Sequence, residues 1–189
     1  MKNRKGLIVG VIIVAVIVAI IAWAVGTYNG LVKLEEETNT AYSNVQVQMQ
    51  RRADLVPNLV NTVKGYAAHE EAIFTAVSEA REKLIGAKSV EETNAANGEL
   101  SSALGRLLAI SESYPELKAN ENFLSLQDQL EGTENRISVA RKDYNDKVQE
   151  YNVKIRSFPS SIFANILNLD KKEQFVADAG ATTVPQVNF

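Results

Sequence analysis

The sequence predicts an all-α fold: an antiparallel bundle of long helices behind one N-terminal transmembrane helix. Three observations lead to this prediction. An uncharged apolar stretch lies near the N-terminus, apolar residues recur at steps of three and four through most of the remainder, and only four prolines and ten glycines occur in 189 residues. Steps of three and four place side chains on one face of an α-helix. Long helices that each bury one face pack together as a bundle.

The apolar stretch from Leu7 to Val25 contains no charged side chain. As a helix it would extend roughly 28 Å, close to the hydrocarbon thickness of about 30 Å. A helix satisfies its own backbone groups in lipid, so the stretch needs no partner. Trp23 and Tyr28 stand where an aromatic belt forms at the far interface. We therefore expect a transmembrane helix over residues 7–27.

A cleaved signal peptide is the alternative interpretation of the same stretch. Lys2, Arg4 and Lys5 would be its charged beginning, and Ala22-Trp23-Ala24 resembles a cleavage site. The apolar run continues past that site, which favours a retained anchor.

The flanking charges predict the orientation of the anchor. Lys2, Arg4 and Lys5 precede it, whereas Lys33 on the other side is followed at once by Glu35–Glu37. The positive-inside rule counts lysine and arginine, so it places the N-terminus in the cytoplasm and the domain outside. The chain is thus expected to comprise a basic flank (1–6), the transmembrane helix (7–27), a helical-bundle domain (28–169) and an irregular C-terminal tail (170–189).

The first helix of the domain is expected to continue directly from the anchor. Leu31, Thr38, Val45 and Met49 belong to one apolar stripe. Pro57 falls inside the pattern, and because proline removes one helical hydrogen bond we expect a kink near Val56. The alternative is that Asp54 caps a fresh helix with Pro57 in its first turn.

Four further features mark later helices. A short helix is expected over residues 70–85, with Gly86 as its C-terminal cap. Two S-x-x-E capping boxes, at Ser89 and Ser113, each predict a helix start, and the second should open the longest helix, to about Arg156. Its near-heptad stripe favours long antiparallel packing or a coiled-coil partner. Phe158-Pro159 should end it, and residues 160–169 should form one more short helix.

Composition argues against several kinds of chemistry. The formal charge is −3, and without the three N-terminal cations the remainder carries −6, which disfavours nucleic-acid binding. Cysteine is absent and His69 is the only histidine, so no zinc or thiolate site is expected. The acidic runs occupy consecutive helical positions and point in different directions. No catalytic, cofactor or metal residue is predicted, and an enzyme with an unrecognised carboxylate site is the remote alternative.

One polar segment stands out within the first helix, because its amide and charged residues are unusually dense for a helix that must also pack. Two interpretations remain open: a satisfied polar network that fixes helix register, or a docking surface for a partner. The residues concerned are Gln50, Arg51, Arg52, Asp54, Pro57, Asn58 and Asn61.

The C-terminal residues 184–189 alternate apolar and polar side chains. They could add to a partner as an edge strand or short peptide, or form a disordered end. Pro185, Val187 and Phe189 are the residues that would carry such a contact.

The anchor, the run from Gln50 to Val60 (QRRADLVPNLV) and the closing PQVNF resemble the LemA family of bacterial membrane proteins. The resemblance covers essentially the whole chain. It implies a helical bundle behind one transmembrane helix in the bacterial inner membrane. The family's biochemical role is poorly defined, and the resemblance implies no catalytic residues.

Two functions are therefore expected before an enzyme. The first is a membrane-anchored interaction or scaffold protein of the cell envelope, whose partners are the lipid bilayer and another protein. The second is a self-assembling, membrane-organising homo-oligomer whose long helices pack between subunits.

Overall fold

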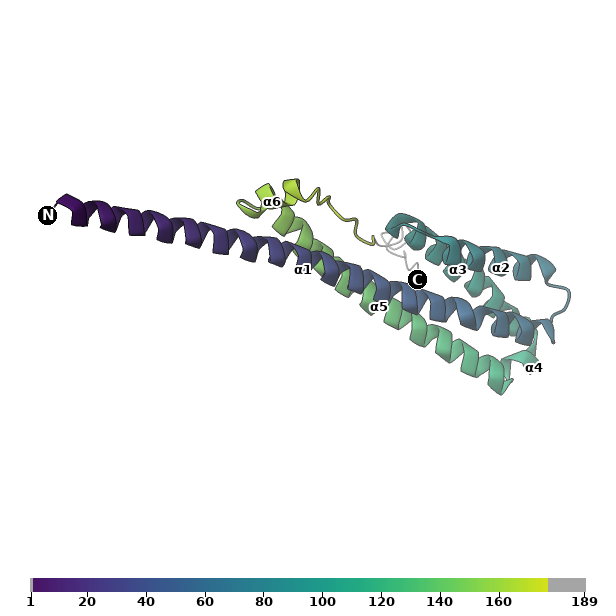
Figure 1. Cartoon of the computed structure of the whole chain (residues 1–189). Helices are drawn as coiled ribbons and strands as arrows, with labels where there is room; N and C mark the ends of the chain where they lie inside the picture. Colours follow the sequence, from purple (N-terminus) through teal and green to yellow (C-terminus); the bar gives the residue numbers. More distant parts are fainter. Residues whose placement is uncertain (1, 177–189) are drawn as a thin grey trace, which may run out of the picture. The chain divides into compact units, whose positions relative to one another are not determined.

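The computed structural model describes residues 2–176, with side chains from Leu7 onward, and every regular element in that range is a helix (Figure 1). No strand occurs among these residues, which confirms the all-α prediction. In chain order the elements are α1 (Lys2–Lys64), α2 (Glu71–Gly86), α3 (Val90–Ala109), the 3-10 helix η1 (Ile110–Ser113), α4 (Pro115–Lys118), α5 (Glu121–Arg156) and α6 (Ser160–Ile166).

The chain divides into two compact units. Among the described residues, the N-terminal unit comprises 2–40 and 147–172, and the bundle unit comprises 41–146 and 173–176. α1 and α5 each contribute residues to both units.

α1 runs without interruption for 63 residues and contains Pro57. The first helix of the domain therefore does continue from the apolar stretch, as expected. A fresh helix capped by Asp54 does not form. The Asp54 side chain instead accepts a hydrogen bond from Gln50 Nε2, 2.7 Å away, on the surface of the same helix.

The capping predictions have mixed outcomes. At Ser89 both bonds of the capping box are present, so that prediction is confirmed. At Ser113 it is wrong: this residue ends η1, and no side chain caps α4. α5 begins later, at Glu121, where the Asn120 Oδ1 accepts from the Phe123 main-chain N–H at 3.0 Å. Gly86 is the last residue of α2 rather than its cap.

The N-terminal unit has a small core after the apolar stretch. Leu31 of α1, Tyr151 and Ile155 of α5 and Ala164 of α6 are buried together. The apolar stretch itself is exposed, and α1 is the one described helix that is long and apolar enough to cross a membrane.

The bundle unit buries an apolar core to which α1, α2, α3 and α5 all contribute. Apolar side chains from all four helices are less than a tenth exposed. They include Val45, Met49, Ala53, Val56, Leu59 and Val63 of α1, Phe74, Val77 and Leu84 of α2, Leu100, Leu104 and Leu107 of α3, and Phe123, Leu130, Ile137 and Tyr144 of α5.

Candidate interaction site

The polar segment of α1 divides into one buried residue and six exposed ones. Arg52 is only 5% exposed, whereas the other residues singled out from the sequence are exposed. At 100° per residue, five of these six fall within about 100° of one another around the helix, opposite the buried stripe. These five residues, called the outer polar face below, are Gln50, Asp54, Pro57, Asn58 and Asn61.

Arg52 joins three helices inside the bundle unit. Its guanidinium donates to Asn97 Oδ1 of α3 at 2.8 Å and to Glu134 Oε2 of α5. Burial lowers the pKa of Arg52 from its usual value, and the Glu134 carboxylate opposes that change. A buried, hydrogen-bonded cation tolerates no shift in helix register, since any shift would separate it from its partners. Arg52 therefore acts in packing and does not belong to the exposed surface.

Pro57 creates a second polar contact on the same helix. Proline has no N–H, so the carbonyl oxygen four residues earlier, that of Ala53, loses its helical donor. Arg81 of α2 fills this position: its Nε–H donates to the Ala53 oxygen at 2.8 Å. The proline is thus accommodated inside a continuous helix because a side chain of a neighbouring helix replaces the missing bond.

The outer polar face has few internal contacts. One bond joins the side chains of Gln50 and Asp54. In another, the Thr62 hydroxyl donates to the main-chain carbonyl oxygen of Asn58 at 2.9 Å, and the Asn58 side chain takes no part in it. Within the described residues, the side-chain amides of Asn58 and Asn61 make no hydrogen bond. Donors and acceptors of two amides are thus available to a partner.

A further arrangement in the bundle unit was not predicted from the sequence: residues 173–176, called the strap below, lie against α5. The Asn145 side chain donates to the Phe175 carbonyl and accepts from the Phe175 N–H, both at 2.8 Å. The Tyr144 hydroxyl donates to the Glu173 carbonyl at 2.9 Å. Burial, with smaller effects of Tyr42 and Glu173, raises the pKa of Tyr144 to about 12. The one available signal was the aromatic Phe175 in a polar stretch without helical periodicity.

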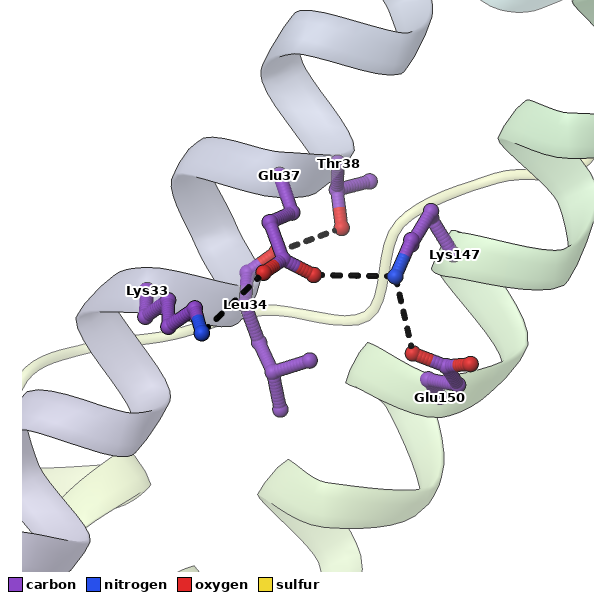
Figure 2. Close-up of polar contacts among 6 residues, drawn as sticks. All are labelled: Lys33, Leu34, Glu37, Thr38, Lys147 and Glu150. Carbon is purple, nitrogen blue, oxygen red and sulfur yellow. Dashed lines mark hydrogen bonds and ion pairs between the residues drawn. The ribbon is translucent and has the colours of Figure 1, made fainter.

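In the N-terminal unit, Glu37 and Lys147 connect α1 to α5 (Figure 2). Their side chains are 2.9 Å apart, and Lys147 also contacts Glu150 at 3.3 Å. Lys33 adds a longer contact to Glu37 at 3.7 Å. The Lys147 ammonium holds the pKa of Glu37 below its usual value, and Glu37 in turn raises the pKa of Lys147.

The described residues contain no group of three or more histidine, aspartate or glutamate side chains able to hold a metal ion. His69 lies exposed in the turn between α1 and α2. Pro185, Val187 and Phe189 of the predicted tail contact lie outside the described residues.

These features define an all-α protein whose first helix has the length and composition of a membrane anchor. The chain belongs to the LemA family: the family model matches residues 41–189. This confirms the family suggested by the QRRADLVPNLV run.

Curated relatives match most of the chain. Magnetosome protein MamQ 2 of Paramagnetospirillum magneticum is 30% identical over 87% of this chain and 70% of its own length. Magnetosome protein MamQ of Magnetospirillum gryphiswaldense is 29% identical over 90% of this chain and 74% of its own. Protein LemA of Metamycoplasma hominis is 26% identical over 77% of this chain and 67% of its own.

Proposed function

We propose that this chain is a membrane-anchored interaction or scaffold protein of the bacterial cell envelope, and that the outer polar face of α1 is its docking surface. The observation that carries the proposal is the exposure of Pro57, Asn58 and Asn61 on the outside of a continuous helix. Asparagine and proline are poor helix formers, proline by about 3 kcal/mol relative to alanine. Arg81 replaces only the hydrogen bond that Pro57 removes, on the packed side. The side-chain amides of Asn58 and Asn61 have no such compensation among the described residues, so we infer that this face serves contact with a partner.

The chemistry of this face indicates the kind of partner. Amide side chains both donate and accept hydrogen bonds, and Arg51 adds an exposed cation beside Asp54. A partner that presents main-chain groups or mixed polar side chains suits such a surface better than a purely apolar one does. We therefore propose a protein partner.

The test of this surface is site-specific photo-crosslinking in intact cells. A crosslinker placed at Asn58 or Asn61 should give discrete adducts. A crosslinker at Glu79 or Glu82, which are exposed on α2, serves as the matched control. The double variant Asn58→Ala/Asn61→Ala should keep its thermal stability. When the crosslinker is placed at position 51 of this double variant, the adducts should be lost. Equal adduct patterns at the α1 and α2 positions would contradict the proposal.

We further propose that residues 7–27 remain as an anchor in the inner membrane, with the N-terminus in the cytoplasm. The low positive charge after the apolar stretch supports this orientation. A tag placed after Phe189 should be accessible to protease in spheroplasts, on a protein of full-length size. A protected tag would reverse the orientation, and a shortened protein would favour the cleaved signal peptide.

Self-association is the second candidate, and one groove of the bundle unit favours it. Ala41, Asn44 and Gln48 of α1 line one wall, and α5 forms the other. Val139 on the α5 wall is 61% exposed, and Gln48 Oε1 is buried without a partner among the described residues. The expected result is an oligomer in detergent that Val139→Lys dissociates. A monomeric wild type would exclude this candidate.

A further inference from the structure

Three large apolar side chains are exposed within nine residues at the α5–α6 turn of the N-terminal unit. Phe158, just before α6, is 83% exposed, and Ile162 and Ile166 of α6 are 50% and 69% exposed. Ile162 and Ile166 are four apart and share one face of the helix. The opposite face of α6 is packed, since Ser160 and Ala164 are buried. α6 is therefore a short amphipathic helix whose apolar outer face is uncovered.

The pairing of α1 with α5 shows which part of α1 this patch lies beside. Lys147 lies opposite Glu37, and the two helices run antiparallel in this unit (Figure 2). Each step forward along α5 is therefore matched by a step back along α1. Arg156, nine residues after Lys147, comes level with Tyr28, and the turn that holds Phe158 lies beyond it. The patch thus lies level with the end of the apolar stretch.

A second, independent contact also places α6 beside the end of the apolar stretch. The ring of Phe163 in α6 packs edge-on against Trp23 of α1, with centroids 5.7 Å apart. Trp23 belongs to the apolar stretch and stands two residues before its end at Val25. α6 is therefore attached at the level where tryptophan side chains meet the membrane interface.

We propose that Phe158, Ile162 and Ile166 enter the bilayer interface, so that α6 is a second membrane contact beside the anchor. This inference rests on the proposed membrane anchor. Lys154 and Arg156 lie exposed in the last turn of α5, next to the patch, where they can meet lipid phosphates. Apolar side chains with adjacent cations are the pattern of an interfacial helix.

A bilayer fits this patch better than a protein does. A stable protein interface buries about 800 Å² on each partner, and three side chains on a seven-residue helix offer far less. The patch instead lies beside the end of the exposed apolar stretch of α1. In the proposed function this stretch is already in lipid, so the same bilayer can cover the patch.

The composition of the chain provides the test. It contains one tryptophan and no cysteine, so single labels can be placed without removing native thiols. Full-length protein carrying Phe158→Cys, Ile162→Cys or Ile166→Cys is labelled with an environment-sensitive fluorophore. It is then reconstituted into vesicles of zwitterionic and anionic lipids whose acyl chains are brominated near the headgroup. Gln149→Cys is the control, because Gln149 is exposed and lies earlier in α5, about two helical turns before its end.

The expected result is that bromolipid quenches the three patch labels at least half as strongly as it quenches Trp23, and leaves the Gln149 label bright. Quenching of Trp23 without quenching of the patch labels would overturn the α6 contact and leave the anchor standing. Absence of quenching at Trp23 would overturn both. If the patch labels are shielded from aqueous iodide but are not quenched by bromolipid, a second copy of the protein covers the patch, and the proposal is overturned.

Discussion

Arg81 donates its Nε–H to the main-chain oxygen of Ala53, the carbonyl that Pro57 leaves without a donor. Replacing Arg81 with methionine should destabilise the bundle unit by about 1–2 kcal/mol, because a part-buried carbonyl loses its partner. In a Pro57→Ala background the helix regains its own N–H donor, so the same replacement should cost much less. Chemical unfolding of the four variants in detergent measures this coupling. Equal costs in the two backgrounds would show that the proline and the arginine act independently.

The ion pair between the buried Arg52 and Glu134 predicts a similar coupling between two substitutions. Glu134→Gln should lower the free energy of unfolding by about 2 kcal/mol, because the buried Arg52 guanidinium keeps its charge and loses the opposing one. Arg52→Met removes that charge, so the double variant should be more stable than the sum of the two single losses predicts. Additive losses in a double-mutant cycle would refute the coupling.

The two S-x-x-E motifs supply a matched pair of variants. Ser89→Ala should cost about 1 kcal/mol, since the Ser89 hydroxyl accepts from the Glu92 N–H at 3.0 Å. Ser113→Ala should change stability by less than about 0.5 kcal/mol, because Ser113 is exposed and caps no helix. Thermal unfolding of both variants tests the distinction. A larger loss at Ser113 than at Ser89 would contradict the structure.

The pair Glu37–Lys147 predicts how the N-terminal unit responds to pH. The folded-state pKa of Glu37 is below 4.5, so its contribution is present above that value and is lost as pH falls through the lowered pKa. The pKa of Lys147 is raised above 10.5, so its contribution is lost as pH rises through the raised value.

The measurement compares the wild type with Glu37→Gln across the acid range by thermal unfolding. The wild type should be the more stable at neutral pH, and the difference should shrink as Glu37 takes up a proton. Glu36→Gln, at an exposed neighbouring position outside the ion pair, is the control for the loss of one carboxylate from the same stretch of helix. A difference between the wild type and Glu37→Gln that is independent of pH would argue against the ion pair.

The helices could be predicted from the sequence where apolar periodicity is long and unambiguous. The stripe of α5 from Phe123 to Ile155 and the continuity of α1 beyond Val25 are cases of this kind. Element starts were harder, because S-x-x-E at Ser89 and at Ser113 looks the same in sequence. Only the packing of η1 before Pro115 decides that the second motif caps nothing.

The candidate site shows a different limit of sequence reasoning. Arg52 and Arg51 are adjacent and chemically identical, yet one is buried and the other exposed. A rotation of 100° per residue separates them. The spacing of three from Met49 placed Arg52 beside the apolar stripe, but only the inward position of Val56 shows that Arg52 lies within the core. Arg81 and Asn145 were missed because their partners are main-chain atoms, which leave no pattern in a sequence.

The bonds from Asn145 to Phe175 recognise a peptide group and not a side chain. Every residue except proline offers the same N–H and carbonyl pair. Evolution can therefore exchange the residues at 173 and 176 with little effect on how the strap is held, while position 145 has no equivalent substitute. In related sequences the constraint should fall on Asn145, which receives the strap, and on the buried ring of Phe175, and the flanking strap positions are the part free to diverge.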